Sequence, residues 1–424
     1  MNQHLFDYIA ASPTAYHAVS HTAAMLRGQG YRELCESDSW ELTAGEHYFV
    51  TRNGSSLIAF RMPNSDFSGF MMTATHSDSP CFKIKENAEI SDSHYVRLST
   101  EKYGGMLCAS WMDRPLSIAG RITVRTENGI AVKLVDLAAP TVIIPNVAIH
   151  MNRNANDGMS YNPAADMLPL VGTDCQKNAL RPRIAESVGI SENDILATDL
   201  FVYNPEKGVE WNDLIAAPRL DDLQCAFSAL TAFLQADNAQ NCPVYCLFDN
   251  EEVGSQTKQG AASTFLTDVL ERIVPDSTEY RRKIANSFLV SADNAHAVHP
   301  NHPEYADKNH SVFVNHGVVI KYNANQKYTT DAISASIFRL VCEKAKIPFQ
   351  FYTNRADMAG GSTLGNIANT QVSLNTVDIG LAQLAMHSAY ETAGAEDTRH
   401  MVNALKSFYE TTLTMKTDGS YELK

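Results

Sequence analysis

The stretch VYCLFDNEEVGS, residues 244–255, sets an apolar run directly before a group of acids. The run VYCLF is continuous rather than alternating, which is typical of a strand covered on both faces. Asp249, Glu251 and Glu252 follow it within four positions. Because ligands bind beyond the carboxyl ends of the strands in an open parallel sheet, we interpret these acids as part of a site at such an edge.

Two further apolar runs end in polar side chains. FMMTATHSD (70–78) ends at His76 and Asp78, and FLVSAD (288–293) ends at Asp293. The carboxyl ends of neighbouring parallel strands lie at one edge of a sheet. The three strand ends are therefore predicted to converge.

A fourth group of acids comes from PRLDDL, in which Asp221 and Asp222 open an amphipathic helix. Capping and the helix dipole favour carboxylates there. Taken alone, such a pair is more often a helix cap, and NEE after a strand is more often a solvated turn. If the acids converge, two carboxylates about 4 Å apart repel by about 4 kcal/mol at an effective dielectric constant of about 20, so the cluster needs bound cations.

The pattern of apolar residues differs between two parts of the chain. In residues 1–85 and 215–424, apolar strands alternate with amphipathic helices, including two short helices at the start of the chain. Between 86 and 214 short strands predominate, and the Asn-Gly pair at 128–129 is a strong hairpin signal. We predict an α/β domain, formed from both ends of the chain, with a β-rich insertion.

The composition disfavours several classes of protein. Of 424 residues, 44% are hydrophobic and 19% are charged, which is typical of a soluble globular chain. The formal charge of −14 disfavours nucleic acids and anionic membranes as partners, because both are polyanions. No apolar run reaches the length of about 18 residues that a membrane helix needs, and the first residues do not resemble a secretion signal. We expect a cytoplasmic protein.

The ligand types narrow the choice of cation. Histidine mixed with Asp and Glu suits zinc, manganese or cobalt, whereas calcium and magnesium favour oxygen alone. Five or six candidate ligands exceed the four of a tetrahedral zinc ion, which favours two ions that share a carboxylate. The adjacent Glu251 and Glu252 then divide into one ligand and one base, because a hydrolytic site needs a carboxylate that moves the proton of water.

Six motifs occur in a fixed order along the chain. They are SPTAYHAV (12–19), THSDSP (75–80), PRLDD (218–222), DNEEVGS (249–255), SADNAHAVHPN (291–301) and AMHSAYE (385–391). In order and spacing they resemble the aspartyl aminopeptidase family of dinuclear zinc exopeptidases. The resemblance spans nearly the whole chain and implies a zinc-exopeptidase-like sheet flanked by helices, with 86–214 as an inserted dimerisation domain. It also implies a zinc metalloaminopeptidase that hydrolyses the N-terminal residue of peptides, often Asp or Glu.

The resemblance implies two zinc ions per subunit, with manganese or cobalt as alternatives. His76 and Asp293 would hold one ion, and Glu252 and His387 would hold the other. Asp221 would bridge the two.

Further roles are implied for residues around the metals. Glu251 would be the general base, and Asp78 would orient His76. His296, Lys321 and Tyr328 resemble substrate contacts. Lys321 also has independent physical sense, since a lysine that ends an apolar strand at the site could pair with a substrate carboxylate; the alternative is a lysine that reaches solvent.

Assembly is implied as well. His150 resembles a residue that family members lend to a neighbouring subunit, and the family's oligomer is a dodecamer built from dimers. Two other functions stay open: a broad or neutral-residue aminopeptidase with the same site, and a metal-stabilised scaffold without activity. Asp222 stands where relatives carry Asn, and Asp249 is expected only to support its loop.

Overall fold

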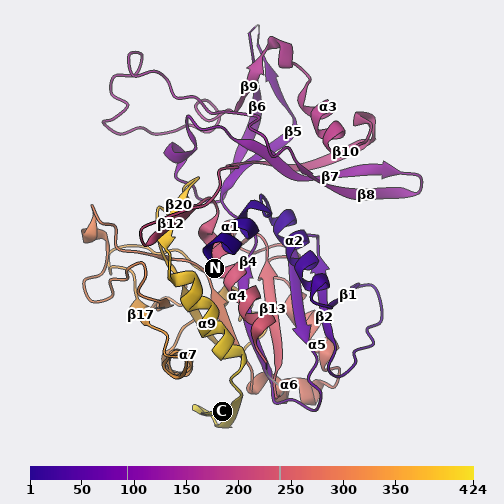
Figure 1. The fold of residues 1–424 in the computed structure, drawn as a ribbon, viewed down its shortest axis with the longest axis vertical. Coiled ribbons are helices and arrows are strands. Elements are labelled where there is room, and N and C mark those ends of the chain that lie inside the picture. The colour runs from indigo at the N-terminus through magenta and orange to yellow at the C-terminus, as the bar shows by residue number, and fades with distance from the viewer. Residues whose placement is uncertain (93, 238–239) are drawn as a thin grey trace.

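A mixed β-sheet covered by helices on both faces forms the lower part of the molecule as drawn in Figure 1. The computed structural model describes residues 1–92, 94–237 and 240–424, and within them this sheet has nine strands. In order across the sheet, they are β1 (Arg32–Leu34), β2 (His47–Arg52), β3 (Ser56–Arg61), β13 (Cys242–Phe248), β4 (Phe70–His76), β14 (Phe288–Ala292), β18 (Asn375–Gly380), β16 (Val318–Lys321) and β17 (Phe349–Tyr352).

Four neighbouring strands in the middle of this sheet are parallel. β13 pairs with β4, β4 with β14, and β14 with β18. Every residue of β13, β4 and β14 is buried, which explains why their sequences are continuous apolar runs. The predicted strands are confirmed, and their carboxyl ends lie at one edge of the sheet.

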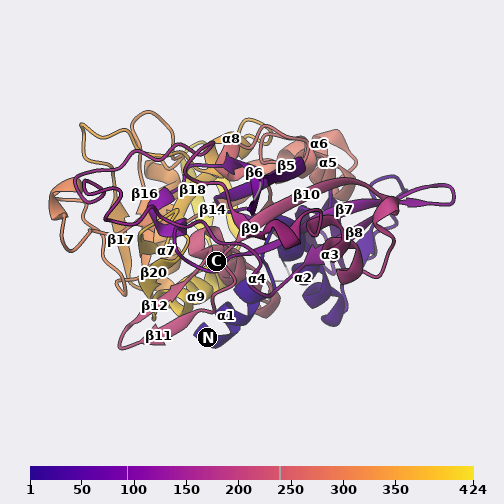
Figure 2. The same cartoon turned by 90° about the horizontal axis from the view of Figure 1, so that it is seen from above.

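Helices cover both faces of the sheet, so the predicted α/β class is confirmed. On one face lie α1 (Asn2–Ala10), α2 (Ala15–Gly28), α4 (Leu220–Gln235), α7 (Ala332–Ala345) and α9 (Asp397–Tyr409), which share one hydrophobic core with the sheet. On the other lie α5 (Phe265–Ile273), α6 (Ser277–Ala285) and α8 (Leu364–Ala368), which pack around a second core. Figure 2 shows α1, α2 and α9 on one side of the strands and α5, α6 and α8 on the other.

A second, antiparallel sheet stands above the main sheet in Figure 1 and has its own hydrophobic core. Over the described ranges it contains β8 (Gly129–Asp136), β7 (Ser117–Thr126), β10 (Ile195–Tyr203), β5 (Cys81–Ser91), β6 (Tyr95–Tyr103) and β9 (Leu170–Thr173), and α3 (Leu180–Ser187) packs on it. The Asn-Gly pair at 128–129 lies at the turn between β7 and β8, as predicted. The division into 1–85 with 215–424 and 86–214 stays a prediction.

A smaller sheet joins segments that are far apart in the sequence. Its strands are β11 (Val209–Trp211), β12 (Leu214–Ala217), β20 (Glu391–Gly394), β19 (Ala382–Leu384) and β15 (Ala295–His296), and a terminal hairpin pairs β21 (Leu413–Thr417) with β22 (Ser420–Leu423). In the part of the chain that the structure describes, no helix has both the length and the apolar character needed to cross a membrane.

Gly317, which precedes β16, is expected to tolerate no side chain. Its φ of +88° lies in the left-handed region, and a Cβ there would be 1.9 Å from the carbonyl oxygen of Pro348. Gly317→Ala should therefore destabilise the fold by more than about 1 kcal/mol and lower the thermal unfolding midpoint. Gly28→Ala is the matched control, because nothing lies within 4 Å of that Cβ and Ala suits the end of α2. Equal midpoints for the two variants would contradict this expectation.

Candidate metal centre

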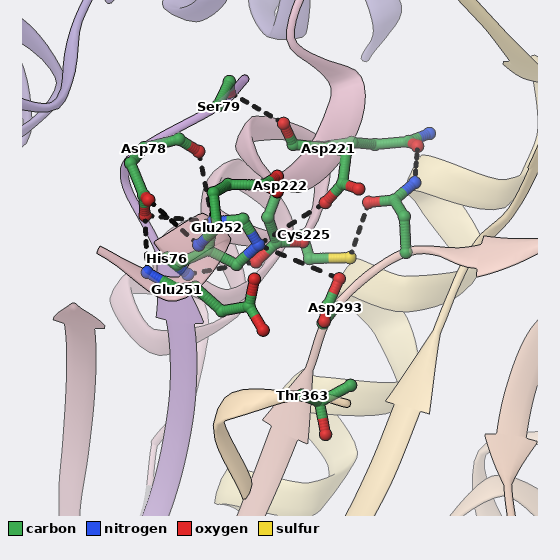
Figure 3. A network of polar contacts seen from close by, with 12 residues as sticks. His76, Asp78, Ser79, Asp221, Asp222, Cys225, Glu251, Glu252, Asp293 and Thr363 are labelled. Atoms are coloured by element: carbon green, nitrogen blue, oxygen red, sulfur yellow. Dashed lines mark hydrogen bonds and ion pairs between the residues drawn. The ribbon is translucent and has the colours of Figure 1, made fainter. Parts of the chain in front are cut away.

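The ends of three buried strands meet at the carboxyl edge of the main sheet. His76 is the last residue of β4, Glu252 lies in a 3-10 turn (Glu251–Val253) just after β13, and Asp293 follows β14. Figure 3 shows the side chains of His76, Asp221 and Asp293 pointing toward one another. The convergence predicted for the strand ends is therefore present in the molecule.

Asp221 lies between two histidines. Its Oδ1 is 3.4 Å from Nε2 of His76, and its Oδ2 is 3.4 Å from Nε2 of His387. Nε2 of His76 is also 3.8 Å from Oδ1 of Asp293, and Nε2 of His387 is 3.4 Å from Oε2 of Glu252. One carboxylate thus joins two groups, each made of a histidine and an acid.

These spacings fit zinc. Zinc binds histidine nitrogen and carboxylate oxygen at about 2.1 Å, so two ligand atoms of a tetrahedral ion lie about 3.4 Å apart. The potential ligand atoms within each group lie within 4.8 Å of one another. Among the described residues, Oδ1 of Asp221 and Oε1 of Glu252 are buried without a hydrogen-bond donor, and a bound cation would satisfy both.

Burial makes this cluster electrostatically costly. It raises the pKa of Asp222 and of Glu252 well above the usual carboxyl values. Burial also opposes ionisation of Asp221, but contacts with His387 and His76 outweigh it and hold the pKa of Asp221 below the usual value. Burial disfavours a charged His76, yet the carboxylates around it, Asp222 first, raise its pKa. Bound protons therefore balance part of the negative charge, and a divalent cation would release them.

Asp78 ties the end of β4 to the turn after β13. Its two carboxylate oxygens accept the N–H groups of Glu251 and Glu252, each at 3.1 Å. Nδ1 of His76 lies 3.1 Å from the carbonyl oxygen of Asp78 and 3.3 Å from its carboxylate. These contacts turn Nε2 of the ring toward the cluster, as an orienting partner of a metal-binding histidine does.

Tyr103, the last residue of β6, is a supporting residue that the sequence analysis missed. Its hydroxyl donates to Oδ2 of Asp78 at 2.7 Å. The glycine that follows it in the sequence marks a close approach of β6 to the turn after β13, because a Cβ on Gly104 would lie 3.1 Å from Cβ of Glu252. The second sheet therefore reaches the candidate metal centre directly.

The two acids without an assigned role are buried and accept backbone N–H groups. Oδ2 of Asp222 accepts the N–H of His76 at 3.1 Å and so fixes the end of β4. Oδ1 of Asp249 accepts the N–H of Asn250 at 2.7 Å, and burial raises the pKa of Asp249 to about 7. Asp249 supports its loop, as expected.

Three predicted substrate contacts lie together beside Asp293. Lys321 is 1% exposed, and its Nζ is 4.0 Å from Oδ2 of Asp293 and 5.1 Å from the ring centroid of Tyr328. Tyr328 and His296 both pack against the ring of Tyr352. Burial opposes a charged amine, but Asp293 raises the pKa of Lys321 above its usual value, so the amine carries its charge.

His150 lies elsewhere. It is exposed on a turn of the long loop between β8 and β9, which projects from the second sheet in Figure 1. Within the described ranges it belongs to none of the groups of potential metal ligands. Its predicted contribution to a neighbouring subunit stays a prediction.

The arrangement has the parts needed for hydrolysis. A cluster that fits zinc lies beside Glu251, whose carboxyl group is partly buried, and burial raises the pKa of Glu251 to about 8. A carboxyl group with a pKa near neutrality can accept a proton and return it. The buried ammonium group of Lys321 adds a positive charge at the side of the cluster.

Comparison with known proteins points to one family. The family model described as aminopeptidase I zinc metalloprotease (M18) matches residues 8–409. A probable M18 family aminopeptidase 2 of Clostridium novyi (strain NT) is 42% identical over 422 residues, which cover 96% of this chain and 97% of that protein.

Two solved structures have a similar fold. The cryo-EM structure of the Ape4 and Nbr1 complex contains a chain that is 34% identical, with a TM-score of 0.93 over 96% of this chain and 85% of that one. The mApe1 dodecamer of S. cerevisiae is 27% identical, with a TM-score of 0.83 over 96% of this chain and 95% of that one.

Zinc is expected to stabilise the folded protein. Adding it to metal-free protein should raise the thermal unfolding midpoint, because a ligand at 100 times its Kd stabilises the native state by about 2.7 kcal/mol. Asp221→Ala removes the shared carboxylate and should greatly reduce this shift, whereas Glu343→Ala, an exposed acid on α7, should leave it unchanged. If zinc does not change the unfolding midpoint of the wild type, or shifts that of Asp221→Ala equally, the assignment of this cluster as a zinc site would be contradicted.

Proposed function

This chain belongs to the M18 family of zinc metallo-aminopeptidases, and we propose that it removes Asp or Glu from the N-termini of peptides. The observation that carries the acidic preference is the charged, buried Lys321, whose Nζ lies 4.0 Å from Oδ2 of Asp293. An ammonium group at the edge of the metal centre favours a substrate side chain that ends in a carboxylate.

The proposal includes two zinc ions per subunit. His76 and Asp293 would hold one ion, Glu252 and His387 the other, and Asp221 would bridge them. The distances of 3.4 Å from the two oxygens of Asp221 to the two histidines support this division. Manganese and cobalt accept the same ligand types. When bound, such an ion lowers the pKa of a water molecule towards 7 and polarises the carbonyl of the peptide bond.

In this proposal Glu251 is the general base. Its backbone N–H donates to Asp78, which holds the residue beside the cluster. It would take the proton of the attacking water and pass it to the nitrogen of the departing peptide. The side chain of its neighbour Glu252 is 3% exposed, and its Oε2 lies 3.4 Å from Nε2 of His387, which suits a ligand rather than a base.

Lys321 would bind the carboxylate of the substrate side chain. Two of its N–H groups donate to the carbonyl oxygens of Asp293 (2.8 Å) and Asn294 (3.3 Å). A lysine has three such groups, so one is left for a substrate carboxylate. Tyr328 and His296 complete this side of the proposed pocket.

Assembly into a dodecamer built from dimers is part of the proposal. The similar mApe1 of S. cerevisiae is a dodecamer. The loop that carries His150 also exposes Val147, Ile149 and Met151, at 55%, 48% and 83%, as a surface that is covered in an oligomer would. We place the dimer contact in the insertion 86–214. A cytoplasmic location agrees with eight free cysteines in the described chain.

One observation favours a broader specificity. Because Lys321 already holds the main chain at Asp293 and Asn294, its role could be to support the metal centre alone. The enzyme would then be a broad or neutral-residue aminopeptidase with the same centre. A scaffold without activity has no use for the carboxyl group of Glu251.

Glu251→Gln should retain zinc and lose catalysis. The amide keeps the size of the side chain but cannot accept a proton, so kcat should fall by about two orders of magnitude or more. Zinc content measured by mass spectrometry of the purified variant should equal that of the wild type. Near-normal turnover in this variant would refute Glu251 as the base.

Lys321→Met should lose acidic substrates selectively. The variant keeps the length of the side chain and removes its charge, so kcat/KM for Asp and Glu anilides should fall at least about tenfold relative to a Leu anilide, as expected for a lost charged hydrogen bond.

Lys283→Met is the matched control for this variant. Lys283 is also a buried lysine that donates to a main-chain carbonyl (Phe67, 2.5 Å) and lies over an aromatic ring, but it is bound far from the centre at α6. Lys283→Met should leave the ratio of kcat/KM for the Asp and Glu anilides to kcat/KM for the Leu anilide unchanged. An equal loss for all three substrates in Lys321→Met, or a wild type without acidic preference, would instead support the broad aminopeptidase.

A further inference from the structure

Glu391 is a buried acid that touches two of the predicted metal ligands through their backbones. It opens β20 and is 2% exposed. Its Oε2 accepts the N–H of Asp221 at 3.1 Å, and its Oε1 accepts the N–H of His387 at 2.7 Å. A single side chain therefore holds two segments that are more than 160 residues apart in the sequence.

The backbone of both segments departs from regular helix or strand. His387 has a φ of +67°, in the left-handed region that residues other than glycine seldom adopt. Asp221, although it lies in the first turn of α4, has the non-helical angles φ −82° and ψ 110°. Since neither N–H is part of a regular helix or sheet ladder, the carboxylate of Glu391 supplies the acceptor that each needs.

Glu391 is itself well anchored. It pairs with Ala217 across β20 and β12, in the strand just before the segment that leads to Asp221. Glu391 therefore links β12 and β20 to both ligand segments, in which Oδ2 of Asp221 and Nε2 of His387 lie 3.4 Å apart.

We propose that Glu391 is a positioning residue, which sets the spacing of Asp221 and His387 and thereby the affinity of the centre for its metal. The inference rests on the proposed function only in that these two residues hold a metal ion. Mutation of residues that hydrogen-bond to the ligands of a metal typically changes its affinity by about 10- to 100-fold.

The alternative is that Glu391 is simply a buried acid that the fold tolerates. Glu391→Gln separates the two roles. Glutamine has one carbonyl oxygen and one NH2 group, so it can accept only one of the two N–H groups and turns a donor toward the other.

The test is the zinc dissociation constant of the metal-depleted full-length protein, measured by competition with a chelator of known affinity. We expect Glu391→Gln to bind zinc about 10- to 100-fold more weakly than the wild type, while the unfolding midpoint of the metal-free protein stays within a few degrees. Glu391→Asp, which keeps the carboxyl group but draws both oxygens back, should also weaken binding, and it carries the test if the glutamine variant does not fold.

Asp397→Asn is the matched control. Asp397 is a buried acid whose carboxylate also accepts two backbone N–H groups, from Asn315 (2.6 Å) and Gly317 (3.0 Å), away from the centre. The Asp397→Asn variant should bind zinc with the same affinity as the wild type. Wild-type affinity in the folded Glu391 variants, or an equal loss in Asp397→Asn, would overturn the role of Glu391 alone. A wild type that binds no zinc would overturn the metal centre as well.

Discussion

The main constraint on this structure is that several carboxylates lie close together in a buried site. Two such groups about 4 Å apart repel by about 4 kcal/mol at an effective dielectric constant of about 20, and this centre contains more than one pair. The fold meets that cost with backbone donors. Asp78 accepts two N–H groups from the turn after β13, and Asp222 accepts the N–H of His76. The remaining negative charge faces inward to the two histidines, where a divalent cation fits.

The carboxyl edge of the main sheet is where this is possible. Parallel strands deliver His76 and Asp293 from adjacent positions, and the turn after β13 adds the glutamates. The second sheet is part of the same arrangement, because Tyr103 at the end of β6 donates to Asp78. The second sheet therefore supports the centre within one subunit, besides the assembly that we propose for residues 86–214.

The sequence predicts the parts of the centre that follow buried strands. Runs of apolar residues that end at His76, just before Asp293 or shortly before Glu251 carry a strong signal, since burial on both faces removes the alternation of a surface strand. His387 carries no such signal, because it lies in a loop with a left-handed backbone, and only the resemblance of AMHSAYE to a known family marked it. Glu391 closes the same motif but acts through main-chain N–H groups of distant segments, and no local pattern predicts such contacts. The sequence predicts Lys321 as a strand end, but no sequence pattern predicts that its side chain donates to the carbonyl oxygens of Asp293 and Asn294.

Asp221 is proposed to be shared between two metal ions, and crystallography of the zinc-loaded protein can locate those ions in anomalous difference maps calculated above and below the zinc absorption edge. Two zinc peaks are expected, one between His76 and Asp293 and one between Glu252 and His387, with a carboxylate oxygen of Asp221 on each. A single peak at full zinc loading, or peaks that Asp221 does not contact, would contradict it.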